Sequence, residues 1–180
     1  MPWTIYESPF GPLTLVAGRA GLREVHFPER KPRLEPVDHD PDALRDVCEQ
    51  LEQYFAGERK AFEIELDLTG TAFRRGVWQA MQALPYGALT TYGALARELG
   101  VGDSGTLVTG VRLTAAQKVA WAVAATPTPI VVPCHRVLGA HGSLTGYRGG
   151  LWRKQALLDF EASNATHPQL RNRGRQPALA

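Results

Sequence analysis

The sequence lacks the long apolar run that a membrane-spanning segment needs. No stretch of its 180 residues approaches the roughly 20 apolar residues that cross a bilayer. The start, Met1-Pro2-Trp3-Thr4, also lacks the charged and apolar blocks of a signal peptide. We therefore expect a cytoplasmic protein with no membrane partner, and its 44% of hydrophobic residues can form an ordinary core.

Cysteine is scarce as well. The two cysteines, Cys48 and Cys134, could form one disulfide at most, and neither lies in the CxxC spacing of zinc sites. The glycine patterns GxGxxG and the P-loop are also missing, and there is no internal repeat. These absences argue against a disulfide scaffold, a metal site and the common nucleotide-binding folds.

Charge is present, but it is unevenly distributed behind a net value of +2. Residues 1–70 carry 8 Lys and Arg against 14 Asp and Glu, whereas residues 71–180 carry 12 against 4. A basic half suits a polyanion, because phosphate contacts supply most sequence-independent affinity for DNA. The alternative is a solvated basic surface.

Hydrophobic periodicity predicts a small α/β unit in the first half. A Pro-rich loop from Pro28 to Asp40 precedes a helix that begins near Asp42 and ends at Gly57, with Cys48 as an inert core thiol. Phe62–Leu68 alternates strictly and predicts an edge or outer strand. Three antiparallel strands joined by Gly/Pro turns are expected at Thr4–Tyr6, Leu13–Val16 and Leu22–Phe27.

The second half is predicted to be mainly helical. One apolar helix face precedes Pro85, a second helix runs from Thr91 to Gly100, and Thr114 opens a third, with Gln117 completing a capping box. The last two form a plausible helix-turn-helix, although a connection of about thirteen residues is long for that motif. Residues 163–180 are predicted to be a basic, disordered tail.

The segment Ile130–Val137 carries the strongest chemical signal, because an apolar strand there ends in Cys134 beside His135. A thiol needs a base or a positive charge to become a nucleophilic thiolate. Neighbouring side chains on a strand point to opposite faces, so their cooperation requires a turn or a bridging water. The alternative, a buried cysteine beside a coincidental histidine, is weakened by the flanking Pro133 and Arg136.

The final predicted helix, Gly150–Glu161, places charge on its buried face. Leu151, Lys154, Leu158 and Glu161 share one stripe. A buried carboxylate needs a partner, so Glu161 is predicted to orient His135 and complete a Cys-His-Glu relay. Alternatively, Glu161 reaches solvent at the helix end. The glycine-rich Ser143–Gly150 is predicted to form a mobile loop over a pocket.

Three motifs together resemble the O6-alkylguanine-DNA alkyltransferase family: Pro133–Val137, Gly146–Leu151 and the segment from Phe73 through Tyr92. The resemblance implies an RNase H-like α/β domain at residues 1–70 and a helical domain with a helix-turn-helix at residues 71–162. It further implies a monomer that binds the minor groove of double-stranded DNA and flips the damaged guanine out of the stack.

The resemblance also implies the reaction. Cys134 would take the alkyl group from O6-alkylguanine, or from O4-alkylthymine, with His135 acting through water as its base and Glu161 orienting His135. Tyr92 would protonate the leaving guanine, and Lys154 matches the pocket lysine. The thioether is too stable to hydrolyse, so each molecule would act once and without a cofactor. The residues expected to contact or cover the flipped base are Val137, Tyr147 and Arg148.

The departures from the family concern DNA engagement. Gln117 replaces the arginine that enters the gap left by the flipped base, and Thr126 replaces an asparagine that acts as a hinge. Trp121 stands where the family has a small residue, and it either packs inward or blocks close approach of DNA. The long loop 101–114 either contacts phosphates itself or marks a changed substrate. The residues expected to face DNA are Arg74, Arg75, Ala115, Ala116, Gln117, Ala120 and Arg136.

Two other functions stay open at this stage. A sensor that binds alkylated DNA without repairing it is favoured by Gln117 and Thr126 and disfavoured by the reactive Cys134. A Cys-His hydrolase would require turnover, which a single-use alkyl acceptor does not show.

Overall fold

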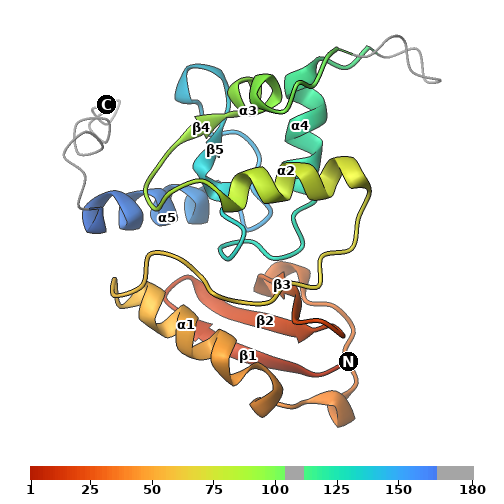
Figure 1. Ribbon diagram of the computed structural model, residues 1–180. Helices are drawn as coiled ribbons and strands as arrows, with labels where there is room; N and C mark the ends of the chain where they lie inside the picture. The colour runs from red at the N-terminus through yellow and green to blue at the C-terminus, as the bar shows by residue number, and fades with distance from the viewer. Residues whose placement is uncertain (104–111, 166–180) are drawn as a thin grey trace.

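The protein divides into two halves, one above the other in Figure 1. This computed structural model describes residues 1–103 and 112–165. The first half holds a three-stranded sheet and helix α1, and the second holds helices α2 to α5 with a short parallel strand pair. Across these described ranges, no helix is both long and apolar enough to cross a membrane.

The predicted antiparallel sheet is confirmed. Strands β1 (Trp3–Ser8), β2 (Gly11–Ala17) and β3 (Leu22–His26) follow one another in the sheet, with β2 in the centre. The turn into β2 needs Gly11, because its φ of 101° lies in the left-handed region that favours glycine. Every residue from Leu13 to Ala17 is buried, so the central strand is covered on both faces.

Helix α1 (Arg45–Phe55) packs on the sheet, as the spacing of its apolar residues predicts. The predicted loop before it contains two 3-10 turns, Pro28–Arg30 and Pro36–Asp38, and a third turn, Asp42–Leu44, leads directly into the helix. Cys48 is half-buried against the sheet core, and burial raises the pKa of its thiol. This environment fits the prediction of an inert core thiol.

The strand predicted at Phe62–Leu68 is wrong. Only one bridge joins this segment to β3: the backbone N–H of Leu22 donates to the carbonyl of Glu65 at 2.8 Å, and that of Asp67 donates to Leu22 at 2.9 Å. Its alternating apolar residues do pack against the sheet core. The alternation therefore marks a segment with one buried side rather than a paired strand.

Three helices of the second half begin at threonine caps. Thr71, Thr91 and Thr114 each accept a hydrogen bond from the backbone N–H three residues further on. The indole N–H of Trp78 donates to the carbonyl of Ala122 at 2.9 Å and joins the helix after Thr71 to the helix after Thr114. The helix after Thr91 packs against the helix after Thr114, as a helix-turn-helix requires. These helices are α2 (Ala72–Gln82), α3 (Tyr92–Glu98) and α4 (Ala115–Ala124).

The apolar strand predicted before Cys134 is also wrong. Residues 129–132 form a turn closed by a single bridge between Pro129 and Val132, with Ile130 at a φ of 77°. The short strand comes after the cysteine instead, where β5 (Val137–Leu138) pairs in parallel with β4 (Thr90–Thr91). A 3-10 turn follows at Ala140–Gly142. Apolar residues in a buried turn give the same sequence signal as a buried strand.

Helix α5 (Leu151–Asn164) extends beyond its predicted end, so residues 163 and 164 are helical rather than part of a tail. Most of the predicted tail, residues 166–180, lies outside the described residues. The predicted stripe is right for Lys154 and Glu161, which are buried, and wrong for Leu151, which is 46% exposed. Sequence spacing alone did not show which turn of the helix meets solvent.

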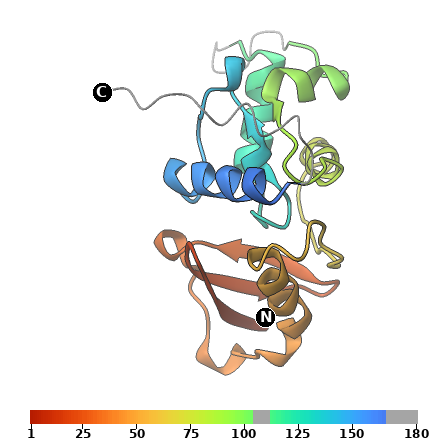
Figure 2. The same cartoon turned by 90° about the vertical axis from the view of Figure 1, so that its left-hand side faces the viewer.

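Helix α5 lies between the two halves and is attached to both (Figure 2). The buried guanidinium of Arg153 donates to the carbonyl of Phe10 at 2.8 Å and to both carboxylate oxygens of Glu29 at 3.0 Å. It also donates to the carbonyl of Gly149 at 2.8 Å. One arginine thus connects the N-terminal sheet to the loop that precedes α5.

Candidate active site

Cys134–Arg136 form a 3-10 turn rather than part of a strand. The backbone N–H of Cys134 donates to Val132 at 2.7 Å, and that of Arg136 donates to Pro133 at 3.0 Å. Cys134 is 5% exposed and His135 is fully buried. Of the two expectations for these neighbours, a turn or a bridging water, the structure shows the turn, so the strand rule that sends adjacent side chains to opposite faces does not apply.

Cys134 opens into a pocket of about 240 Å³. The pocket lies among α3, α4 and the glycine-rich loop, whose residues Thr145 to Arg148 form one wall. The loop therefore covers a pocket, as predicted. The predicted residues that line it are Tyr92, Ala120, Thr126, Cys134, Tyr147 and Arg148, and Trp121 lines it with them.

The thiol of Cys134 is poorly ionised in this pocket. Burial raises its pKa to about 11, although the positive charge of Lys154 acts in the opposite direction. At neutral pH almost all of the sulfur therefore carries its proton. A nucleophile here needs a base.

His135, the residue after Cys134, is the candidate for that base. Its Nε2 lies 2.8 Å from Oε1 of Glu161, and its Nδ1 is buried without a hydrogen-bond partner. An ionised carboxylate can only accept, so Nε2 carries the proton of the neutral ring and Nδ1 keeps its lone pair. The unpartnered nitrogen is thus the one that can take a proton.

Glu161 is buried at 1% exposure, so the alternative that it reaches solvent is wrong. Burial alone would raise the pKa of its carboxyl, but His135 and Arg136 hold that pKa below its ordinary value. The backbone N–H of Gly87 also donates to it, at 3.1 Å. The carboxylate therefore remains charged and fixes the imidazole.

Arg136 occupies the core rather than the DNA surface. Its Nε and Nη2 each donate to Glu161 at 2.8 Å, its Nη1 donates to Leu84 at 2.7 Å, and the residue is 5% exposed. The prediction that Arg136 contacts DNA is therefore wrong. A basic residue beside a nucleophile is equally suited to pair with a buried carboxylate, and only the fold distinguishes the two cases.

Lys154 and Tyr92 share one hydrogen-bond acceptor, the carbonyl of Thr145. The ammonium of Lys154 donates to the carbonyl of Val137 at 2.7 Å and to that of Thr145 at 3.1 Å. The hydroxyl of Tyr92 donates to the same Thr145 carbonyl at 3.2 Å, and burial raises its pKa, so it holds its proton. Val137 is fully buried, and it meets this group through its carbonyl.

Thr126 couples α4 to the glycine-rich loop. Its hydroxyl donates to the carbonyl of Val123 at 2.7 Å, and its own carbonyl accepts from Arg148 at 3.2 Å. The side chain is buried at 1% exposure. Thr126 therefore lies between the end of α4 and the pocket wall, which is where a hinge residue is expected.

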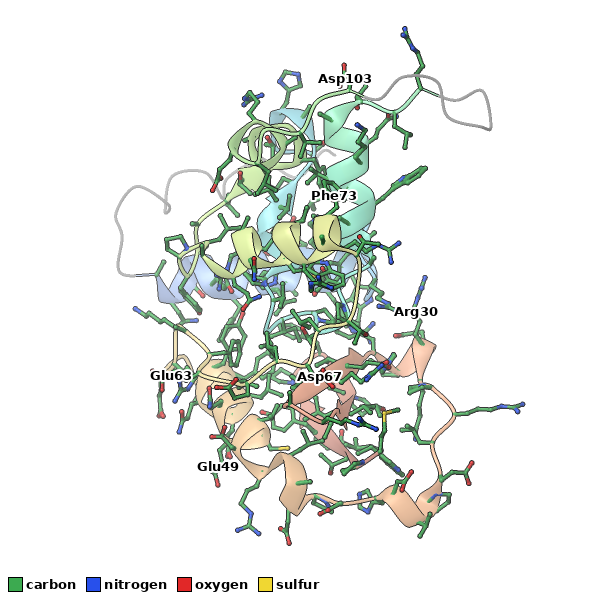
Figure 3. All side chains as sticks on the ribbon, turned by 45° about the vertical axis from the view of Figure 1, so that its right-hand side comes forward. Arg30, Glu49, Glu63, Asp67, Phe73 and Asp103 are labelled. Carbon is green, nitrogen blue, oxygen red and sulfur yellow. The ribbon has the colours of Figure 1, made fainter. Side chains whose placement is uncertain are left out.

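Gln117 is exposed, and its side chain folds back onto the start of α4. Its side-chain oxygen accepts from the backbone N–H of Thr114 at 2.9 Å, which is the predicted capping box. Asp103, labelled at the top of Figure 3, accepts from the N–H of Ala115 at 2.7 Å. The predicted DNA contacts Ala115, Ala116 and Ala120 are partly buried, whereas Arg74 and Arg75 are exposed. Residues 104–111 of the long loop lie outside the described residues.

Tyr54 is the site residue that sequence reasoning missed. Its hydroxyl donates to Oε1 of Glu161 at 2.8 Å across 107 positions of sequence. The tyrosine belongs to α1, so the N-terminal half contacts the carboxylate that holds His135. No short-range pattern marks such a pairing, because helical spacing identifies only the side of a helix that is buried.

Replacing Tyr54 by phenylalanine is expected to lower the free energy of unfolding by about 1.5–3 kcal/mol, because a hydrogen bond to a charged group is lost while the ring stays. Tyr86→Phe is the matched control: its ring lies 5.9 Å from that of Tyr54, but its buried hydroxyl has no hydrogen bond. The free energy of unfolding of Tyr86→Phe should stay within about 0.5 kcal/mol of that of the parent. Urea denaturation measures both values, and equal losses would contradict the assignment.

Comparison with known proteins agrees with this geometry. Residues 1–68 match the family described as "6-O-methylguanine DNA methyltransferase, ribonuclease-like domain", and residues 72–163 match its "DNA binding domain". A methylated-DNA–protein-cysteine methyltransferase of Methanosarcina acetivorans is 40% identical over 91% of this chain and 99% of its own length. One from Mycobacterium bovis is 42% identical over 88% and 91%, respectively.

The similarity extends to solved structures. The crystal structure titled "Mycobacterium tuberculosis OGT in complex with DNA" shares 40% of its sequence with this chain, with a TM-score of 0.79. The match covers 94% of this chain and 98% of that one. Both halves of this chain therefore share their fold with that structure.

Proposed function

Because this chain belongs to the 6-O-methylguanine DNA methyltransferase family, we propose that Cys134 is the residue that receives the alkyl group. The protein is a methylated-DNA–protein-cysteine methyltransferase that repairs DNA by direct reversal. The observation that carries the assignment to Cys134 is its place in the pocket, next to a histidine whose free nitrogen can accept a proton. Cys48 lies in the other half, against the sheet core.

In this proposal the reaction is one displacement. His135 removes the thiol proton of Cys134 through a water molecule, and Glu161 stabilises the imidazolium that forms. The sulfur attacks the O6-alkyl carbon, a sulfur–carbon bond forms, and the carbon–oxygen bond breaks with its electron pair leaving on guanine. Tyr92 protonates that guanine. Lys154 favours the thiolate by its charge and positions the carbonyls of Val137 and Thr145.

The same scheme makes the protein a single-use reagent. A thioether does not hydrolyse under these conditions, so neither repeated product release nor a cofactor enters the scheme. A lesion sensor is not favoured, because the curated relatives described above carry the name of methyltransferases. A Cys-His hydrolase differs in one measurable respect, since a substoichiometric amount of it would release product repeatedly.

The test uses a duplex that contains O6-methylguanine in excess over the protein. After digestion, mass spectrometry should find one added methyl group on the Cys134 peptide and none on the Cys48 peptide, which is an internal control. Repair should stop at one guanine per protein molecule. An unmodified Cys134 under DNA excess, or continued product release, would refute the proposal. The same assay with O4-methylthymine determines whether that lesion is also a substrate.

The DNA side of the proposal rests on the exposed face of the second half. The protein would bind as a monomer, place α4 in the minor groove and flip the damaged base into the pocket. Support comes from the exposed Arg74 and Arg75 at the start of α2 and from the excess of basic residues in this half. Arg148 and Tyr147 would then cover the flipped base.

Replacing Arg74 or Arg75 by alanine is expected to weaken DNA binding at low salt. Each lost phosphate contact should reduce the slope of log K against log salt concentration by about 1. Fluorescence anisotropy over a salt series measures that slope. Arg33→Ala, an exposed arginine of the N-terminal half, is the control and should leave it unchanged. Unaltered slopes for both α2 variants would remove α2 from the DNA surface.

A further inference from the structure

The outer part of the pocket carries an exposed indole. Trp121 is 61% exposed, yet it lines the same pocket as Cys134, which is 5% exposed. The indole therefore lies toward the solvent end of the pocket and the sulfur toward its inner end. Of the two alternatives for Trp121 in the sequence analysis, inward packing is wrong.

The two polar side chains of α4 are hydrogen-bonded elsewhere and do not occupy the outer end of the pocket. Gln117, one turn earlier on the same stripe, accepts from the backbone of Thr114. Lys118 donates to the carbonyl of Gly102 at 2.6 Å. Both are held toward the start of the helix, so the large side chain that α4 presents at the pocket is Trp121.

The alkyl-transfer reaction determines how the alkylated base is oriented in the pocket. An in-line displacement aligns the sulfur, the alkyl carbon and the O6 oxygen, so the guanine ring lies on the side opposite the sulfur. The sulfur is at the inner end, and the ring must therefore extend toward the mouth. There it meets walls formed by Trp121, Tyr147 and the small Ala120 and Ala124.

We propose that Trp121 is a specificity-determining residue whose indole stacks on the purine ring of the alkylated base. This inference rests on the proposed function, because it needs an alkylated base in the pocket. Stacking requires only two aromatic faces, and a bicyclic purine covers more of the indole than a pyrimidine does. Trp121 therefore favours alkylated guanine over alkylated thymine.

The test uses the free base O6-benzylguanine, which has no sugar or phosphate, and follows benzyl transfer to Cys134 by mass. Trp121→Ala should raise the concentration for half-maximal rate about tenfold, within the range of base–aromatic stacking, and leave the maximal rate within about twofold. The half-maximal concentration of Trp121→Phe should lie between those of the parent and Trp121→Ala. Trp152→Ala is the matched control, because that indole is 57% exposed but stacks on Arg153.

The outcomes separate the possible failures. Identical kinetics for the parent and Trp121→Ala on the free base would overturn the inference, as would a defect that appears only on duplex DNA. A parent protein that gains no methyl group on Cys134 from the O6-methylguanine duplex would instead refute the proposed function. On duplexes, Trp121→Ala should lose more rate on O6-methylguanine than on O4-methylthymine. Alanine suits an exposed helix position, and thermal unfolding verifies that the variant folds.

Discussion

His135→Gln is expected to slow alkyl transfer at pH 7 by about 10²- to 10⁴-fold, the usual contribution of a general base. With a thiol pKa of about 11, only about one molecule in ten thousand carries a thiolate at that pH. Glutamine can still donate its amide N–H to Glu161, so the buried carboxylate keeps a partner. The variant therefore removes the basic nitrogen with little change in packing.

The pH dependence distinguishes loss of the base from loss of structure. Below the thiol pKa, each unit of pH increases the thiolate about tenfold, so the rate of His135→Gln should rise about tenfold per unit from pH 7 toward pH 10. The parent should rise less steeply, because His135 removes the proton within the pocket. The measurement is single-turnover kinetics on an O6-methylguanine duplex at each pH.

His141→Asn serves as the control for this series. His141 is exposed and lies outside the pocket wall, and asparagine tolerates its positive φ of 57°. Its rate and its pH profile should match those of the parent. A His135→Gln variant with the parent's rate at pH 7 would show that the thiolate forms without the imidazole.

Glu161→Ala is expected to lower the free energy of unfolding by about 3–5 kcal/mol, the range for removing one partner of a buried ion pair. Its side chain accepts hydrogen bonds from Tyr54, Arg136 and the backbone of Gly87, and it pairs with His135. Alanine leaves the arginine charge buried without a counter-ion. Glu161→Gln keeps the volume and an acceptor, so it should lose less.

Urea denaturation at pH 7 measures these losses, with Glu49→Ala as the control, because Glu49 is exposed on α1 (Figure 3). Acid adds a second readout. The carboxyl pKa is held below its ordinary 4.5 in the folded protein, so its stabilisation is complete above that value and shrinks as the pH falls below it. Glu161→Ala should lack this part of the acid dependence. Equal stabilities of parent and variant would contradict the pairing.

The elements that local patterns describe could be predicted from the sequence. Threonine caps located the starts of α3 and α4, and glycine and proline located the turns of the sheet. The charges on the predicted buried face of α5 identified Glu161 as the partner of His135, and the two side chains do pair. These signals succeed because caps, turns and buried charges have strict local requirements.

What could not be predicted depends on contacts between distant segments. The link from Tyr54 to Glu161 spans 107 positions, and the burial of Arg136 follows from the carbonyl of Leu84 and the carboxylate of Glu161. Phe62–Leu68 has the alternation of a strand but makes only one bridge with β3. Periodicity reports which side of a segment is buried, and it does not report what covers that side.

The start of α4 has a consequence for how this protein can change over evolutionary time. The first N–H groups of the helix are satisfied by Thr114 and by Asp103, and Gln117 returns a bond to Thr114. Within the described residues, the first turn of the helix is therefore capped by the two ends of the preceding connection, Asp103 and Thr114. Insertions and deletions in that connection can accumulate while the face of α4 at the pocket stays in register.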